Sequence, residues 1–141
     1  MDCLGATLLE GEPLKWFNFP RGGAFSLPTE WWIEAGMDLL QPGEELSYVR
    51  TAHPPSKLYP VRAIEPPHMG QRLRRGHGGF THDRMVNVLR DIARGREIRP
   101  IEMIEGASDE YSYRLKDGAH RFHASVVAGF PLIPAIIVVH Y

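Results

Sequence analysis

The sequence is poor in cysteine, and it has no long hydrophobic run. Its single cysteine, Cys3, excludes an internal disulfide framework and fits a reducing compartment. The longest apolar run, at residues 133–139, is far shorter than the roughly 20 residues of a membrane-spanning helix. No charged-then-apolar secretory signal opens the chain. We therefore expect a soluble cytoplasmic protein, and its 141 residues suit one globular unit.

An excess of charge of one sign is also missing, because 16 lysines and arginines stand against 17 aspartates and glutamates. This balance argues against a protein that coats nucleic acid. The balance hides a local bias, because nine arginines and only four carboxylates lie between residues 61 and 100. The net charge is therefore +5 in this segment and −6 in the rest of the chain. Lysine is scarce, and arginine's planar fork suits phosphate better than lysine does. The segment is either a solvated arginine-rich surface or part of an anion site.

Residues 1–57 are rich in proline and glycine, contain all three tryptophans and carry no motif. A helix is predicted from about residue 29 to residue 40, because apolar residues recur there at near-helical spacing between Pro28 and Pro42. We expect the tryptophans to be core or covering residues rather than a binding platform. The segment is interpreted as an N-terminal extension with one helix and an unknown role.

From residue 58 onward the pattern predicts the order strand, helix, strand, strand, helix, strand. The predicted strands are residues 58–64, 100–104, 111–116 and 133–139, and the predicted helices are 81–95 and 117–128. A basic, glycine-rich loop at residues 71–79 precedes the first helix. The sequence thus predicts an α+β domain over residues 58–141.

The strand-to-helix turn at residues 115–121, LKDGAHR, carries the most chemistry. Gly118 permits a tight turn and a close backbone approach, and free N–H groups at a helix start form an anion site. Arg121 can fork onto phosphate oxygens, and His120 can donate a hydrogen bond or relay a proton. The alternative interpretation is that Asp117 merely caps the helix while His120 and Arg121 are surface residues.

Four histidines lie in or near these segments, at positions 77, 82, 120 and 123. Transition-metal ligands are usually closer in sequence or joined by cysteine or carboxylate, so we expect no resident metal site. Asp117 could instead hold Mg²⁺ that a nucleotide carries.

Residues 117–138, DGAHRFHASVVAGFPLIPAIIV, resemble the ParB/sulfiredoxin-like superfamily. Its members have a (D/G)G-x-(H/R)-R-x-x-A helix after a strand, then G-x-x-x-(I/V)-P before a last strand. Residues 88–101 resemble that family's helix, glycine and next strand, and residues 63–72 resemble the opening of chromosome-partitioning ParB proteins. The resemblance covers residues 58–141 and implies a small β-α-β-β-α-β domain that binds nucleotide phosphates at this turn.

The resemblance further implies a nucleoside triphosphate, ATP or CTP with Mg²⁺, as the ligand. The residues that it assigns to this ligand are Gly118, Ala119, His120, Arg121, Arg84 and Arg72, of which Arg84 matches by spacing alone. Glu65 and Asp117 are the candidate general bases. The basic loop at residues 72–77 would close over the phosphates or contact DNA.

One departure from the family narrows the function. Ala119 stands where sulfiredoxins have their nucleophilic cysteine, which argues against repair of an oxidised cysteine. Three hypotheses stay open: an enzyme that hydrolyses or transfers phosphate, a non-catalytic module that a nucleotide switches and that associates with DNA, and a domain that keeps the fold without the ligand.

Overall fold

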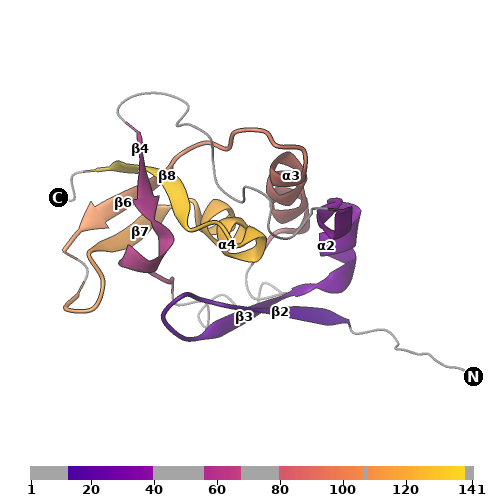
Figure 1. The fold of residues 1–141 in the computed structure, drawn as a ribbon, viewed down its shortest axis with the longest axis horizontal. Helices are drawn as coiled ribbons and strands as arrows, with labels where there is room; N and C mark the ends of the chain where they lie inside the picture. Colours follow the sequence, from indigo (N-terminus) through magenta and orange to yellow (C-terminus); the bar gives the residue numbers. More distant parts are fainter. Residues whose placement is uncertain (1–12, 40–55, 68–79, 107, 139–141) are drawn as a thin grey trace, which may run out of the picture.

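The structure is a computed structural model that describes residues 13–39, 56–67, 80–106 and 108–138 (Figure 1). One mixed sheet has the strand order β4-β8-β6-β7-β5. Its strands are β4 (Lys57–Pro60), β5 (Ile64–Glu65), β6 (Ile101–Glu105), β7 (Tyr113–Asp117) and β8 (Leu132–Ile137). The central strand β6 pairs parallel with β8 and antiparallel with β7. The predicted α+β class is confirmed.

Two helices complete this unit and pack against each other. α3 (His82–Ala93) precedes β6, and α4 (Ala119–Ala128) connects β7 to β8. The helical spacing of Met85, Leu89 and Ile92 places all three in the core, as predicted. From α3 onward, the predicted order of helix, strand, strand, helix and strand is therefore confirmed.

The first predicted strand, residues 58–64, is wrong as one continuous strand. A short 3₁₀ helix, η2 (Val61–Ala63), divides it into β4 and β5. β4 pairs antiparallel with β8 at one edge of the sheet, whereas β5 pairs parallel with β7 at the other edge. The buried Val61 donates its N–H to the carbonyl of Pro131 at 2.9 Å. This bond fixes the point where the chain crosses between the two edges.

The described part of the N-terminal segment forms a hairpin that was not predicted. β2 (Leu14–Asn18) pairs antiparallel with β3 (Ala24–Pro28), and α2 (Thr29–Glu34) follows at once. The helix predicted to reach residue 40 is wrong beyond Glu34, because Gly36 has a φ of +87° and a 3₁₀ helix, η1 (Met37–Leu39), follows it.

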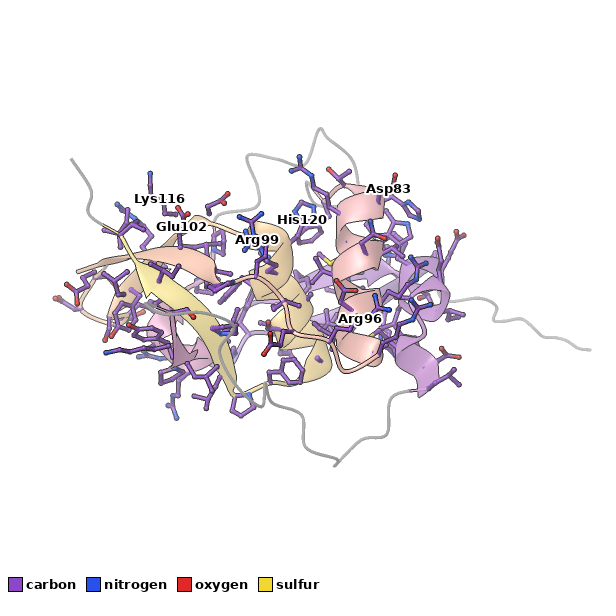
Figure 2. All side chains as sticks on the ribbon, turned by 90° about the horizontal axis from the view of Figure 1, so that it is seen from above. Asp83, Arg96, Arg99, Glu102, Lys116 and His120 are labelled. Carbon is purple, nitrogen blue, oxygen red and sulfur yellow. The ribbon has the colours of Figure 1, made fainter. Side chains whose placement is uncertain are left out.

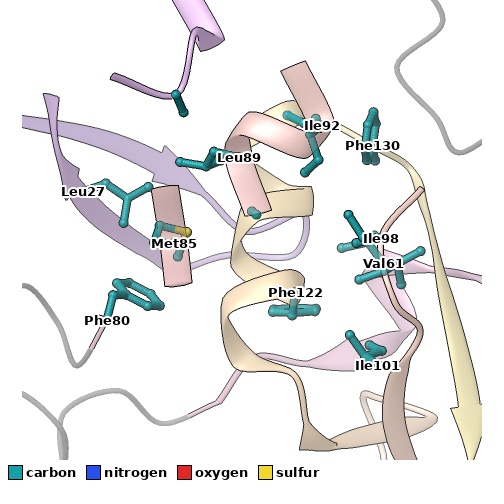
Figure 3. Close-up of a cluster of buried hydrophobic side chains, with 14 of the residues drawn as sticks. Leu27, Val61, Phe80, Met85, Leu89, Ile92, Ile98, Ile101, Phe122 and Phe130 are labelled. Atoms are coloured by element: carbon teal, nitrogen blue, oxygen red, sulfur yellow. The ribbon is translucent and has the colours of Figure 1, made fainter. Parts of the chain in front are cut away.

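The hairpin and α2 contribute to the same hydrophobic core as α3 and α4 (Figure 3). Leu27 is fully buried, and Trp31 is nearly so. Trp31 is thus a core residue and Trp32 covers the core, as expected, whereas Trp16 is 65% exposed. Within the described residues, no helix is both long and apolar enough to cross a membrane.

Candidate anion-binding site

The turn between β7 and α4 is built around Gly118. This residue is the N-cap of α4 and has a φ of +108°, a conformation that residues with a side chain rarely adopt. A Cβ atom here would lie 2.8 Å from Cγ2 of Ile101 and 3.2 Å from Nη2 of Arg121. Glycine is therefore required both by the backbone conformation and by the packing of these two side chains.

Asp117 does not cap α4, so that interpretation is wrong. No side-chain hydrogen bond caps this helix. Asp117 is instead the last residue of β7, and its Oδ2 lies 3.6 Å from Nη2 of Arg121, one helical turn ahead. The carboxylate is 70% exposed, so this ion pair contributes little to stability.

Arg121 is largely engaged by the protein itself. Its Nη1 donates hydrogen bonds to the carbonyl of Pro100 at 2.6 Å and to that of Arg99 at 3.2 Å. Burial lowers the pKa of this guanidinium, and the like charge of Arg99 acts in the same direction, whereas Asp117 opposes both. Arg121 remains cationic, because an arginine does not lose its proton in a protein.

His120 joins the start of α4 to the start of α3. Its Nε2 accepts a hydrogen bond from the backbone N–H of Thr81 at 2.9 Å. Accepting this bond requires a neutral ring with its proton on Nδ1. Thr81 is the N-cap of α3, although its side chain makes no capping hydrogen bond.

A cleft of about 1120 Å³ opens over this turn. Its walls come from α3, from the segment before β6, and from the end of β7 with the first turn of α4. It is lined by Pro67, Thr81, Arg84, Asn87, Val88, Asp91, Glu97, Ile98, Arg99, Leu115, Lys116, Asp117, Gly118, Ala119, His120 and Arg121.

The cleft brings together most of the residues predicted for the site. Arg84, Asp117, Gly118, Ala119, His120 and Arg121 all line it. Glu65 does not line the cleft. It lies in β5, where its register partner in the parallel neighbour β7 is Arg114. Arg72 and the basic loop at residues 72–77 lie outside the described residues.

Sequence reasoning missed two cations of the cleft, Arg99 and Lys116. Figure 2 shows Arg99 beside His120, with Lys116 farther along the same side of the molecule. The alternation in β7 signalled an outward-facing Lys116, because it falls on the face opposite Leu115. Nothing in the sequence pattern distinguished Arg99 from the arginines around it.

The charges of the cleft are unevenly paired. Among its carboxylates, Asp91 pairs with Arg96 at 3.5 Å and Asp117 pairs with Arg121. In contrast, the side chains of Arg84, Arg99 and Lys116 form no ion pair or hydrogen bond with any residue that the structure describes. Three cations without such partners, next to the positive end of α4, create a positive potential in this cleft.

The described histidines have separate roles. His82 contacts the carboxylates of Glu34 and Asp83 at 2.9 and 2.7 Å. His123 is fully buried and donates from Nδ1 to the carbonyl of Ala119 at 2.7 Å. Across the described parts of the chain, no three His, Cys, Asp or Glu side chains gather as a metal site would require. His77 lies outside those parts.

The sequence matches no protein-family model and no curated protein sequence. The structure is similar to the crystal structure of sulfiredoxin from Arabidopsis thaliana, with a TM-score of 0.45 and 24% sequence identity. The likeness covers 62% of this chain and 88% of that chain. This likeness concerns the fold alone. No family model links the chain to the chromosome-partitioning ParB proteins.

Proposed function

We propose that this protein binds the phosphate groups of a nucleoside triphosphate in the cleft over the first turn of α4. The observation that carries this proposal is the set of three cations, Arg84, Arg99 and Lys116, that have no partner among the described residues. They surround a helix start whose first N–H groups have no acceptor within the helix. An anion with several charged oxygens would satisfy both groups of donors.

The size of the cleft supports a ligand larger than inorganic phosphate. Its volume of about 1120 Å³ lies slightly above the usual range of small-molecule sites, which is roughly 300 to 1000 Å³. A triphosphate would bring its own Mg²⁺. Among the carboxylates that line the cleft, Asp117 belongs to the turn itself and is the candidate ligand for this ion. Both ATP and CTP are candidate ligands.

Binding with slow or absent turnover is favoured over phosphoryl transfer. Of the two candidate bases, Glu65 does not line the cleft, and Asp117 is paired with Arg121. Nε2 of His120 already accepts a hydrogen bond from Thr81. A general base must reach the proton that it removes, and these groups would first have to leave their present contacts.

The test is a calorimetric titration of ATP, CTP and tripolyphosphate, each with Mg²⁺, into the wild type and three single variants. Replacing Arg84, Arg99 or Lys116 by alanine should weaken binding by about tenfold each, because each removes a charged hydrogen-bond donor. Added salt should reduce the affinity for the ligand more steeply in the wild type than in the variants.

Arg114→Ala is the matched control for this experiment. Arg114 is an exposed residue of β7, two positions before Lys116 on the same face of the strand, and it does not line the cleft. Its loss removes the same charge and should leave binding almost unchanged. The proposal is wrong if the wild type binds none of the three ligands, or if the three variants bind as the control does.

A further inference from the structure

We propose that Arg121 is a positioning residue, which holds the backbone of residues 99–100 so that the Arg99 side chain contacts the bound anion. The inference rests on the proposed function for its ligand. It assigns different roles to two arginines that both line the cleft. The sequence motif alone would give the phosphate contact to Arg121.

The hydrogen bonds of Arg121 show how its guanidinium is used. Nη1 donates to two consecutive carbonyls, those of Arg99 and Pro100, and Nη2 faces Asp117. The side chain is only 17% exposed. Both N–H groups of Nη1 are bonded to the backbone, so the end of the fork formed by Nη1 and Nη2 is not available for a bidentate contact to phosphate. The remaining donors, on Nε and Nη2, belong to a largely buried side chain beside Asp117.

The segment that Arg121 holds has no regular secondary structure. Residues 96–100 join α3 to β6 and belong to no helix or strand. Their carbonyl groups therefore need partners from outside regular structure, and Arg121 supplies one donor to each of the last two. Without this side chain, both carbonyls would lose the hydrogen bonds that fix the end of the segment.

The packing beneath this contact directs Arg99 outward. Ile98 and Ile101, on either side of Arg99 and Pro100, are both buried in the core, whereas Arg99 is exposed. Ile101 also lies against Gly118 at the base of the turn. The segment is thus anchored at both ends, and the side chain between the anchors is the one that faces the cleft beside His120 (Figure 2).

A double-mutant cycle separates a positioning role from a direct contact. We expect Arg99→Ala and Arg121→Ala each to weaken binding of tripolyphosphate with Mg²⁺ by about tenfold. The double variant should then bind within about twofold of either single variant, because Arg121 acts through Arg99. Losses that multiply to about a hundredfold would show a direct contact and overturn the inference.

Arg121→Lys tests the same inference by chemistry, and it also serves if the alanine variant does not fold. Lysine keeps the charge but lacks the planar fork that spans two carbonyls. We expect it to weaken binding as much as alanine does. Affinity close to that of the wild type would mean that charge alone suffices, and it would overturn the positioning role.

Hydrogen exchange gives a readout that needs no ligand. The backbone amides of Ile98, Arg99 and Ile101 should exchange faster in Arg121→Lys than in the wild type, and at the wild-type rate in Arg99→Ala. Unchanged exchange in Arg121→Lys would overturn the inference. If the wild type binds no polyphosphate, the proposed function fails, and this exchange measurement still decides whether Arg121 positions the segment.

Discussion

At the scale of single residues, Gly118 is the most constrained position of the candidate site. The positive φ alone would strain any other residue, and the Ile101 side chain occupies the space that a Cβ atom would need. The same glycine brings α4 close enough for Arg121 to reach the carbonyls before β6. The lack of a Cβ atom at this residue thus permits the close contact between the start of α4 and Ile101 of β6.

Gly118→Ala should therefore cost about 3 kcal/mol of unfolding free energy, combining backbone strain with overpacking against Ile101. Gly95→Ala is the matched control, because Gly95 also has a positive φ, +71°, but a Cβ atom there meets nothing within 4 Å. The control should cost only about 1 kcal/mol. Urea unfolding of both variants measures the difference, and equal losses would show that contact with Ile101 has no energetic effect.

The sequence predicted which residues gather at the turn better than it predicted what they do. Glycine, histidine and arginine at these spacings indicated an anion site, and the structure places them around one cleft. The sequence could not show that Arg121 donates to carbonyls more than twenty residues earlier. Such contacts depend on how β6 and α4 pack, and this packing leaves no local pattern.

At the scale of helices and strands, periodicity predicted the helices best. α3 repeats its apolar residues at helical spacing and lies within one or two residues of the predicted bounds. Pro60 was a local signal that residues 57–65 are not one continuous strand, but nothing local showed that the two strands lie at opposite edges of the sheet. The β2–β3 hairpin did have a signal, since Gly22 and Gly23 separate two apolar segments.

The contact between α2 and α3 depends on pH through His82. The hydrogen bond to Glu34 of α2 raises the pKa of His82 above its ordinary value of 6.5, and the bond to Asp83 adds to this rise. The stabilisation is therefore complete below about pH 6.5 and is lost as pH rises through the folded-state pKa. We expect the difference in unfolding free energy between the wild type and His82→Ala to shrink as pH rises.

Urea unfolding at several pH values between about 5.5 and 8.5 measures this difference, because other titrating groups cancel in the comparison. Glu34→Gln removes the carboxylate whose hydrogen bond contributes most to the rise in the pKa of His82. In that background, the effect of His82→Ala should vary much less with pH. A difference that stays constant in the wild-type background would mean that His82 does not link the two helices through its charge.

At the scale of the whole molecule, the N-terminal hairpin completes the core around α4. The ring of Phe25 lies 4.8 Å from that of His123, edge to face, and the ring of Phe19 lies 6.2 Å from that of Phe122. Phe80, which directly precedes the N-cap of α3, contacts the same histidine at 4.8 Å. This arrangement could not be predicted, because residues 13–39 carry no motif that connects them to residues 58–141.

Phe25→Ala should consequently destabilise the whole protein, by about 3 to 5 kcal/mol, because it opens a cavity against His123 and Phe80. Trp16→Ala is the control on the same hairpin, and it should change stability by less than about 0.5 kcal/mol, because Trp16 is largely exposed.

In Phe25→Ala, unfolding followed by tryptophan fluorescence reports the region before residue 57, and far-ultraviolet circular dichroism reports all helices and strands. The two curves should coincide at the lower midpoint if the hairpin and the sheet unfold together. Two separate transitions, with only the fluorescence change shifted, would show that the hairpin is an independent addition to a core that is stable without it.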